Sequence, residues 1–376
     1  MDFSLTEEQQ AVRDLFRDFA TREIQPVAAE LDLHPRFPEE IFAQAAELGF
    51  FAMRYPEADD GCGGGGLDKL GFLLAVRELA RGSLGVAAAL TMQALMGTHF
   101  VHMHAKGELR QQIVKPALAG KVLGTICMTE PDAGSDLFSM TAKAELRDGT
   151  WYLTGQKTWI TSATFADMFT VFARTGDKEL SIFLVLKGAP GLVVGKAIDK
   201  MGVRTSLTSE LNFADTPAVC MLGERGAGIP SVRSILGEIR LMTAALALGV
   251  ADAALADAVR YSQEREQFGK PICRFQAIQL HLAKMKTEHQ AAESLMYWAH
   301  WLGEQGQDNA EASAMAKLKA SEMAVDVCDR ACRIFASYGY AREYPVERYL
   351  RDARFTLVGG GTSEILEVNI ARGMTR

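Results

Sequence analysis

The chain has 376 residues, long enough for two or three domains that share a large core. Its apolar content of 48% and charged content of 23% are those of a soluble globular protein. The net charge of −7 and the pI near 5.6 argue against nucleic acid as a partner. No apolar run reaches the roughly 18 residues that span a bilayer, and the acidic N-terminus lacks a signal-peptide pattern, so a cytoplasmic protein without a membrane partner is expected.

Neither the cysteines nor the histidines predict a metal site or a disulfide framework. The six cysteines are spread along the chain, and Cys328 and Cys332 are the one close pair, at helical i, i+4 spacing. His99, His102 and His104 lie close together but lack the carboxylate or Cys neighbours that a metal site would want. Reduced thiols and no metal are therefore expected.

Residues 1 to about 120 read as helices and loops. Thr6, followed by two glutamates, fits a helix N-cap, and apolar residues then recur on one face over 12–19. Mostly apolar helices are predicted over Leu67–Leu79 and Gly85–Phe100. Residues 55–66 include four consecutive glycines, but no strand precedes them and no Gly-Lys-Ser/Thr follows, which favours a flexible turn over a phosphate-binding loop.

The segment Ile126–Asp136, with sequence ICMTEPDAGSD, is predicted to be a polar loop leaving the edge of a sheet. An apolar run ending in Gly124–Met128 reads as a strand end, and the Thr, Ser, Asp, Pro and Gly that follow interrupt regular structure. Hydroxyls and backbone N–H groups in such a loop suit a flat ligand with many acceptors. Asx and Ser turns of similar composition are also common connectors, so a purely structural role stays open on chemistry alone.

From about residue 121 to 228 the pattern changes to strands and turns. Aromatic-bearing strands joined by short turns suggest a small antiparallel barrel or sandwich. Trp159 is flanked by threonines within Lys157–Thr161, so its ring can lie beside a planar heterocycle while hydroxyls address the polar edge. A strand aromatic packed in the core is the alternative. The expected strands are Lys143–Leu146, Trp151–Thr154, Met168–Ala173, Ile182–Leu186 and Leu192–Lys196.

From about residue 229 to the end the chain is expected to be helical again. Ile235–Ala256 is almost uniformly apolar with small residues, which indicates a helix buried on most sides. Ala310–Phe335 reads as another long helix. Thr362–Ala371 reads as a shorter one whose capped start leaves backbone N–H groups free.

This order, together with five motifs spread along it, resembles the acyl-CoA dehydrogenase family over essentially the whole chain. Thr129–Asp136 matches the family's flavin- and substrate-binding loop at eight positions, and Trp159-Ile160-Thr161 matches its flavin-flanking Trp-Ile-Thr. The other three matches are Arg265-x-Gln267-Phe268-Gly269-x-Pro271-Ile272 with Phe275-Gln276, Tyr338-Gly339-Tyr340 with Pro345–Arg348, and Arg351-Asp352-Ala353 with Gly361–Ile365.

The resemblance implies an α+β fold that is mostly α: a helical N-terminal domain over 1–120, a central β-domain over 121–228 and a C-terminal four-helix bundle over 229–376. It implies FAD as cofactor and a homodimer or homotetramer, because the family's FAD lies across a subunit boundary. Residues 126–135 and 159–161 would line the isoalloxazine of FAD. The segments 265–276 and 333–337 would hold its adenosine diphosphate part. The cofactor residues carried over are Ile126, Met128, Thr129, Gly134, Ser135, Trp159, Ile160, Thr161, Arg265, Phe268, Gln276, Arg333, Ser337, Thr362 and Glu364, and the substrate residues are Ser135, Arg240, Gly360 and Gly361.

The family's catalytic carboxylate is absent from both of its usual positions. In most members it stands directly before the Gly-Thr of the last signature, here Gly360, and in a second subgroup it precedes the Arg that corresponds to Arg240, here Ile239. Glu238 is the remaining candidate for a relocated base, although a step of one residue turns a helical side chain by about 100° onto a different face. Loss of a general base removes about 10²–10⁴ in rate, and the three glycines 359–361 are expected to open the reaction cavity.

Three functions follow from this pattern. The first is an FAD-dependent oxidoreductase of an acyl thioester, on CoA or a carrier protein, with a missing or relocated base and an external electron-transfer flavoprotein as acceptor. The second is a flavoenzyme of the same fold that does not dehydrogenate, namely a monooxygenase, lyase or isomerase of a thioester. The third is a non-catalytic FAD-binding homologue.

Overall fold

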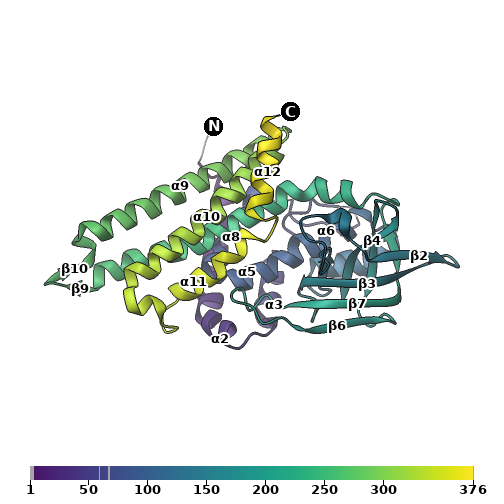
Figure 1. Cartoon of the computed structure of the whole chain (residues 1–376), viewed down its shortest axis with the longest axis horizontal. Coiled ribbons are helices and arrows are strands. Elements are labelled where there is room, and N and C mark those ends of the chain that lie inside the picture. The colour runs from purple at the N-terminus through teal and green to yellow at the C-terminus, as the bar shows by residue number, and fades with distance from the viewer. Residues whose placement is uncertain (1–3, 59, 67, 376) are drawn as a thin grey trace.

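The computed structural model describes residues 4–375 apart from 59 and 67, and Figure 1 shows two helical parts joined to a β-domain. The predicted order, helical domain, β-domain and helical domain, is confirmed. The N-terminal helices are α1 Glu7–Phe19, α2 Ala28–Leu33, α3 Glu39–Glu47, α4 Lys69–Gly82, α5 Leu84–Thr91, α6 Thr98–His104 and α7 Lys115–Leu118. The strands of the β-domain are β1 Gly124–Cys127, β2 Lys143–Arg147, β3 Thr150–Thr161, β4 Met168–Gly176, β5 Glu179–Leu186, β6 Leu192–Ala197, β7 Thr208–Pro217 and β8 Cys220–Leu222. The C-terminal elements are α8 Gly228–Glu264, β9 Glu266–Gln267, β10 Lys270–Pro271, α9 Gln276–Glu304, α10 Ala310–Phe335, α11 Val346–Ala353 and α12 Ser363–Met374.

The first helix begins where its cap predicts. The Thr6 hydroxyl accepts the backbone N–H of Gln9, and the Gln9 side chain accepts the backbone N–H of Thr6, which completes a capping box. On the inner face of α1, Phe16 and Phe19 are buried, so the predicted apolar face packs against α4. Leu15 is the exception, because it lies mainly exposed.

The β-domain is a single, mainly antiparallel sheet. Its strand order is β6-β7-β3-β2-β4-β5-β8, with β1 paired to β4. The expectation of an antiparallel barrel or sandwich is wrong in part, because β1 and β4 run parallel and β2 meets β4 in parallel at one position. In β4, Met168 and Phe172 join the large core that the helices share, whereas Phe169 and Val171 join a smaller core on the opposite face.

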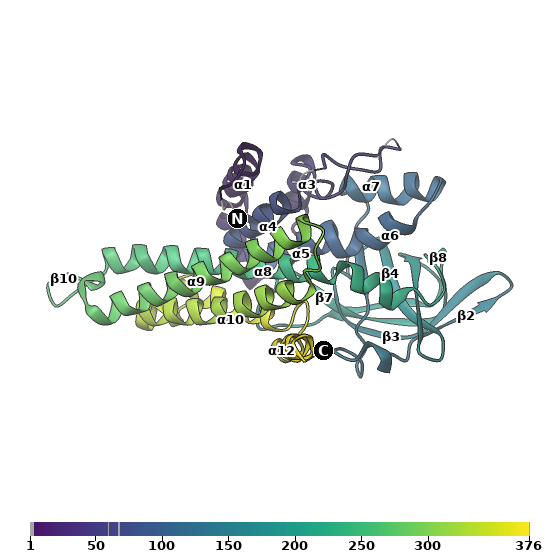
Figure 2. The same ribbon diagram turned by 90° about the horizontal axis from the view of Figure 1, so that it is seen from above.

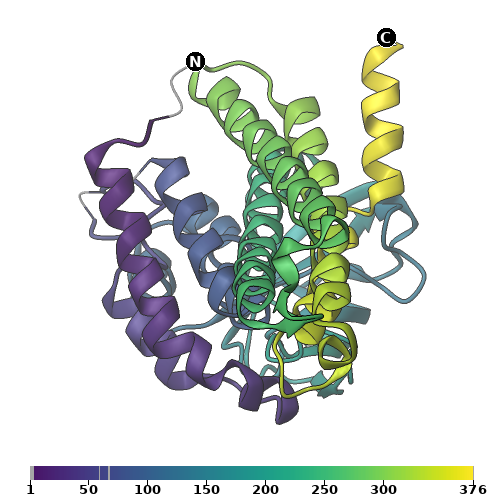
Figure 3. The ribbon, with the colours of Figure 1, turned by 90° about the vertical axis from the view of Figure 1, so that its left-hand side faces the viewer.

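The C-terminal domain is built on α8, a helix of 37 residues whose apolar middle is buried against α4 and α10. Its length carries the chain away from the β-domain to a short β9–β10 hairpin at the far end of the bundle (Figures 1 and 2). Both turn residues of this hairpin, Phe268 and Gly269, have positive φ, as two-residue hairpin turns require. Seen from that end, α1 in purple and α12 in yellow lie on opposite sides of the bundle (Figure 3).

Two helical stretches, Leu84–His104 and Gly228–Glu264, are long and apolar enough to cross a membrane by length and composition alone. In each, 83% of the apolar window is buried inside the folded chain, as in core helices of soluble proteins. Among the residues that the structure describes, no group of three His, Cys, Asp or Glu is arranged to hold a metal ion. All six cysteines are free thiols.

Candidate functional site

An apolar cavity of about 210 Å³ lies where the β-domain meets the helices. α5 and the π-helical turn Met92–Gly97 form one wall, α8 forms a second, and β3 with the glycines 359 and 360 forms a third. Across the described part of the chain, no side chain that lines the cavity is ionisable near neutral pH. The lining residues are Ala88, Thr91, Met92, Met96, Ile126, Met128, Thr129, Trp159, Ile160, Thr161, Ser206, Ile239, Met242, Thr243, Leu246, Phe355, Gly359 and Gly360.

Part of the predicted cofactor set gathers at this cavity. Six of its members line the wall on the β-domain side, and Gly360, predicted for the substrate, lies opposite in the glycine segment. Gly134 and Ser135 lie exposed further along the same polar loop and do not line the cavity. The six lining members are Ile126, Met128, Thr129, Trp159, Ile160 and Thr161.

A buried ion pair fixes the start of the polar loop to β3. Lys157 Nζ lies 2.8 Å from Glu130 Oε1 and also donates to the backbone carbonyl of Met128. Glu130 further accepts the backbone N–H groups of Thr141 and Ala142, at 2.6 and 3.0 Å. Although burial raises the pKa of Glu130, the Lys157 ammonium holds it below its ordinary value. A fully hydrogen-bonded buried pair of this kind fixes geometry more than it adds stability.

The same strand carries a β-bulge that aims Trp159 out of the sheet. The pairing of β3 with β7 shifts between Lys157 and Ile160, and the freed Thr158 N–H donates to the carbonyl of Thr129 at 2.9 Å. Trp159 adopts φ +59°, and 58% of it is exposed at the cavity. The indole is therefore not a core side chain, which removes the alternative reading of this motif, and its face is open to a flat ligand.

The rest of the predicted cofactor set lies at the opposite end of the chain. Arg265, Phe268 and Gln276 surround the β9–β10 hairpin, far from the sheet in Figures 1 and 2. Along α8, Arg265 is about 30 Å from Thr243, at 1.5 Å per residue. Phe268 is 92% exposed, and Arg265 lies 5.9 Å from the ring of Tyr338, which brings the segment 333–337 with Arg333 and Ser337 to the same end.

The glycine segment 359–361 is anchored by hydrogen bonds from Lys317 and leads directly into α12. Lys317 is buried, and its Nζ donates to the carbonyls of Leu357 at 3.2 Å and Gly361 at 2.5 Å. Burial lowers the pKa of Lys317 to about 8. The predicted cap of α12 is confirmed, since the Thr362 hydroxyl accepts the N–H of Ile365, and Glu364 follows in the exposed first turn.

Gly359 and Gly360 do not leave the open space that their small size suggested, whereas a Cβ on Gly361 would make only an ordinary contact with Leu366 at 3.7 Å. A Cβ on Gly360 would lie 2.8 Å from Thr243 Oγ1, and a Cβ on Gly359 would lie 2.8 Å from the ring of Phe355. Gly360 also has φ +70°, a conformation that disfavours any side chain. The expectation of an enlarged cavity is therefore wrong at this position, because Thr243 and Phe355 have closed in on the backbone.

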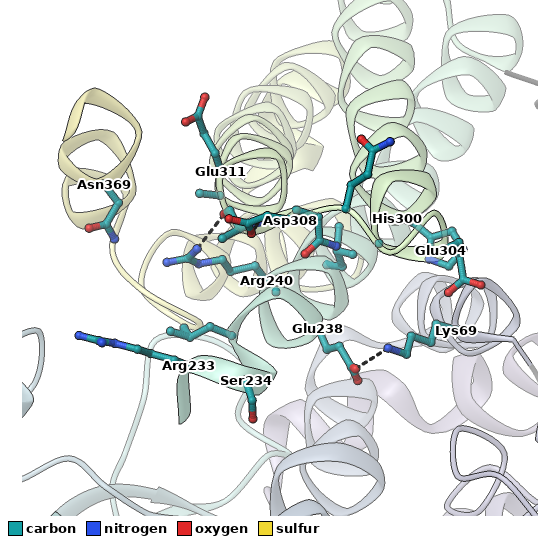
Figure 4. Close-up of a pocket in the computed structure, with 18 of the residues that line it drawn as sticks. Lys69, Arg233, Ser234, Glu238, Arg240, His300, Glu304, Asp308, Glu311 and Asn369 are labelled. Carbon is teal, nitrogen blue, oxygen red and sulfur yellow. Dashed lines mark hydrogen bonds and ion pairs between the residues drawn. The ribbon is translucent and has the colours of Figure 1, made fainter. Parts of the chain in front are cut away.

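Glu238 does not reach the cavity. Its carboxylate forms ion pairs with Arg54 and, at 2.9 Å, with Lys69 on the N-terminal domain (Figure 4). Although burial raises the pKa of Glu238, these two cations hold it below its ordinary value. Glu238 lies on another helix face and lines the other cavity, and the two cations lower the proton affinity of its carboxylate, which argues against Glu238 as the relocated base.

Arg240 lines a second, polar cavity of about 960 Å³ on the other side of α8. Its guanidinium donates to the carbonyl of Ala310 at 3.0 Å, and burial lowers its pKa. Figure 4 shows Arg233 and Asn369 on the same side as Arg240, whereas Glu238 points toward Lys69. Ile239 lies between Glu238 and Arg240 in sequence but faces the apolar cavity, so α8 separates the two cavities.

Several cavity residues were not predicted from the sequence. Thr91, Met92 and Met96 come from the helical stretch after α4, and Met242 and Leu246 come from α8. Met and Leu normally pack in a core, and a threonine within an apolar helix carries no signal of its own. No sequence signal distinguishes them, because the π-helical turn that brings Met92 and Met96 to the cavity appears only in the fold.

The residues present fit FAD in two respects. An exposed indole beside an apolar cavity and a hydroxyl-bearing loop suits the flat, polar-edged isoalloxazine. The exposed ring of Phe268 and the guanidinium of Arg265 at the distant hairpin suit the adenosine diphosphate part of FAD. Fold and site together define a flavin-dependent oxidoreductase in which a helical bundle closes over a β-domain.

Known proteins identify the family. The models of the acyl-CoA dehydrogenase N-terminal, middle and C-terminal domains match residues 6–121, 125–216 and 226–375. The chain therefore belongs to the acyl-CoA dehydrogenase family, and it is an FAD-dependent oxidoreductase of acyl thioesters.

Three similar proteins bear on the chemistry. The chain is 54% identical over 376 residues to benzylmalonyl-CoA dehydrogenase of Aromatoleum aromaticum, covering 99% of each chain. It shares 37% identity and a TM-score of 0.95 with a chain in the structure "Electron transferring flavoprotein of Acidaminococcus fermentans", covering 100% of both. It shares 30% identity and a TM-score of 0.94 with the FAD complex of PigA, covering 100% of this chain and 99% of the other. These relatives do not favour the non-dehydrogenating and non-catalytic alternatives.

Proposed function

We propose that this protein oxidises a 2-carboxyacyl thioester, a substituted malonyl thioester, and that loss of the substrate's own carboxylate as CO₂ replaces removal of the α-proton by a base. The observation that carries this proposal is the apolar cavity, whose described lining holds no ionisable side chain. Without a base at Gly360, Ile239 or Glu238, proton removal from an ordinary acyl thioester lacks its acceptor.

A malonyl thioester overcomes this lack because of its structure. Its α-carbon carries both the thioester carbonyl and a carboxylate. When the bond between that carbon and the carboxylate breaks, CO₂ departs and the electron pair stays on the α-carbon, delocalised into the thioester. This is the same electron pair that a base would uncover by taking the α-proton. The similarity to benzylmalonyl-CoA dehydrogenase, whose name describes such a substrate, supports this substrate class.

The apolar lining also promotes carboxylate loss. An ionised carboxylate in surroundings without a cation is poorly solvated, which raises its free energy. Loss of CO₂ lowers this free energy because the negative charge then spreads into the thioester. Met92, Met96 and Leu246 then present the apolar surface that a hydrophobic group on the α-carbon would contact. Bound FAD supplies the acceptor for the hydride that leaves the β-carbon. Trp159, Thr129 and Thr161 are the residues of this chain that would position it.

Coenzyme A is the proposed carrier of the acyl group. The polar cavity beyond α8 is lined by Arg233, Arg240 and Arg372 as well as by the carboxylates of Glu238, Glu304, Asp308 and Glu311. The guanidiniums are the groups in this lining that suit the phosphates of coenzyme A. The carried-over substrate residues Ser135 and Gly361 lie outside both cavities, and they remain proposals for contacts made when substrate binds.

The assembly and the acceptor complete the proposal. A homodimer or homotetramer would bring the hairpin of one subunit to the β-domain of another, because one chain keeps them at opposite ends. An external flavoprotein is the proposed electron acceptor, supported by the likeness to a chain in the electron transferring flavoprotein structure. Dioxygen is the competing acceptor, and oxygen consumption during turnover decides between them. The cytoplasm is the proposed location.

A matched pair of substrates tests the function. Benzylmalonyl-CoA and 3-phenylpropanoyl-CoA differ only in the 2-carboxylate. Mixed anaerobically with the yellow protein, the first should bleach the flavin and release one CO₂ for each flavin reduced, while the second should bleach it at least about a hundredfold more slowly. Equal bleaching by both thioesters, or bleaching by the first without CO₂, would contradict the proposal.

A further inference from the structure

The apolar cavity also controls what happens after CO₂ has left. The electron pair then on the α-carbon has two fates. In the first, the Cβ–H bond breaks and the pair forms the Cα=Cβ bond, which gives the unsaturated thioester, and bound FAD would supply the acceptor for the hydride. In the second, the α-carbon takes a proton, which gives the saturated thioester and leaves the flavin oxidised.

We infer that this protein lacks the family's catalytic carboxylate because a carboxylic acid at that place would protonate the α-carbon and divert the reaction to the saturated thioester. The inference rests on the proposed function. The absence of a carboxylic acid at the base position is then required for the unsaturated thioester to form. The residues of the cavity wall determine which of the two thioesters is released.

The first observation is that the hydroxyl protons of the two helix threonines that line the cavity, Thr243 and Thr91, are turned away from it. The Thr243 hydroxyl donates to the carbonyl of Ile239 at 2.8 Å. The Thr91 hydroxyl donates to the carbonyl of Ala87 at 2.8 Å. Both side chains therefore present lone pairs rather than protons to the cavity. The other lining hydroxyls, those of Thr129, Thr161 and Ser206, are alcohols and far weaker acids than a carboxylic acid.

The second observation is that neither usual base position carries an acid, and that one of them, Gly360, accepts no side chain without strain. At Gly360 the positive φ and the 2.8 Å approach of Thr243 Oγ1 to a Cβ leave no room for a side chain without strain. At Ile239 the apolar cavity wall is continuous, and the side chain is buried. The nearest carboxylate in sequence, Glu238, is held on another face of α8 by Arg54 and Lys69.

The test restores an acid to the cavity wall. Ile239 lies within α8, where a glutamate meets no backbone strain, and Ile239→Gln is the matched control because it has nearly the same shape without an acidic proton. Burial raises the pKa of a carboxyl group, so the new side chain would hold its proton near neutral pH. A positioned acid speeds proton transfer by about 10²–10⁴, so the share of saturated product should rise at least about tenfold in Ile239→Glu.

The measurement is made on the FAD-loaded protein with benzylmalonyl-CoA in D₂O. Mass spectrometry of the thioesters gives the ratio of unsaturated to saturated product and the deuterium on the α-carbon. The wild type should form the unsaturated thioester almost alone, and Ile239→Glu should add saturated thioester carrying one solvent deuterium, while Ile239→Gln should not. Thr243→Asp, with Thr243→Asn as its control, repeats the test from the other wall.

Two results would overturn the inference. One is abundant saturated product from the wild type. The other is a folded, yellow Ile239→Glu or Thr243→Asp protein that gives no more saturated product than its amide control. Absence of CO₂ release from the wild type is a separate outcome that removes the proposed function itself. If both acidic variants fail to fold, the product ratio of the wild type still decides, because abundant saturated thioester from the wild type would contradict the inference.

Discussion

The charged side chains near the apolar cavity form ion pairs with one another and do not line the cavity itself. Glu238 is bound to Arg54 and Lys69 across two domains, and Lys157 is bound to Glu130 beneath the polar loop. In each case the charge fixes a position, and the cavity keeps an uncharged lining.

Glu238→Gln should weaken the fold and leave the chemistry largely intact. The change keeps the shape of the side chain but takes a charged acceptor from the nearly inaccessible guanidinium side chain of Arg54, so the free energy of unfolding should fall by about 1–3 kcal/mol. The rate of flavin reduction by substrate should change less than about threefold. Glu238 does not act as the general base, so the factor of about 10²–10⁴ that a base supplies is not lost. Chemical denaturation and rapid mixing measure the two effects. Glu304→Gln, an exposed carboxylate in the same polar cavity, is the control, and a hundredfold loss of rate in Glu238→Gln would restore it as the base.

Lys157→Met should loosen the flavin loop. It leaves the Glu130 carboxylate buried without its cation, a change that typically costs about 3–5 kcal/mol of stability. FAD titration of the apoprotein should show weaker binding, since the loop and the Trp159 bulge share this anchor. Lys143→Met breaks an exposed Lys–Glu pair on β2 and should change neither quantity measurably. Unaltered FAD affinity in Lys157→Met would remove the pair's positioning role.

Among the helices, α11 is docked on the β-domain through a buried carboxyl group. Asp352 accepts the backbone N–H of Val203 at 2.6 Å, and burial raises the pKa of Asp352 to about 6. Because the folded form binds this proton more tightly than the unfolded form does, the group's stabilisation is full below about pH 4. It is lost as the pH rises through about 6.

Asp352→Asn should therefore stabilise the protein at neutral pH. Asparagine keeps the acceptor oxygen for Val203 and carries no charge to bury, so the free energy of unfolding at pH 7 should rise by about 1–3 kcal/mol. Denaturation curves at intervals between pH 4 and 7 measure this, and the wild type should lose relative stability over that range while the variant does not. A variant less stable than the wild type at pH 7 would show that the ionised carboxylate stabilises the fold, and it would contradict this prediction.

The sequence predicts those elements whose pattern is local. The cap at Thr6, the helix Ala310–Phe335 and the buried middle of α8 follow from capping chemistry and apolar periodicity. β7 and β8 were missed: β7 places Leu211 and Phe213 inward among polar residues, and β8 is only three residues long. Their pairing depends on distant strands rather than on their own propensity.

The same distinction between local pattern and distant contacts applies to the residues of the site. Motif residues at Trp159 and in the polar loop were predicted, and the loss of the usual base was visible at Gly360. The approach of Thr243 to Gly360 and the partners of Glu238 could not be predicted, because each depends on how α8 is rotated against two other domains. A side-chain offset of about 100° on one helix decides which cavity a residue faces, and composition does not record it.

For the molecule as a whole, the separation of the two proposed halves of the cofactor site predicts that FAD binding is linked to the proposed assembly. Arg265→Ala should weaken FAD binding by about tenfold to a hundredfold, since hydrogen bonds to charged groups contribute about 1.5–3 kcal/mol. Arg274→Ala removes a charge at the same end and should have a smaller effect. Light scattering and FAD fluorescence on dilution should show subunit dissociation and FAD release together. A monomer that keeps FAD at full occupancy would contradict the shared site.

The hairpin at 265–271, carried to the far end of the bundle by α8, has a genetic consequence. In a two-fold assembly, a subunit damaged only at the hairpin and a subunit damaged only at the bulge of β3 form a hybrid in which one site receives both lesions and the other receives none. Mixing inactive Arg265 and Trp159 variants under conditions that exchange subunits should therefore restore activity, up to about a quarter of the sites. Two defective alleles of this gene would complement each other, whereas two lesions in the same half would not.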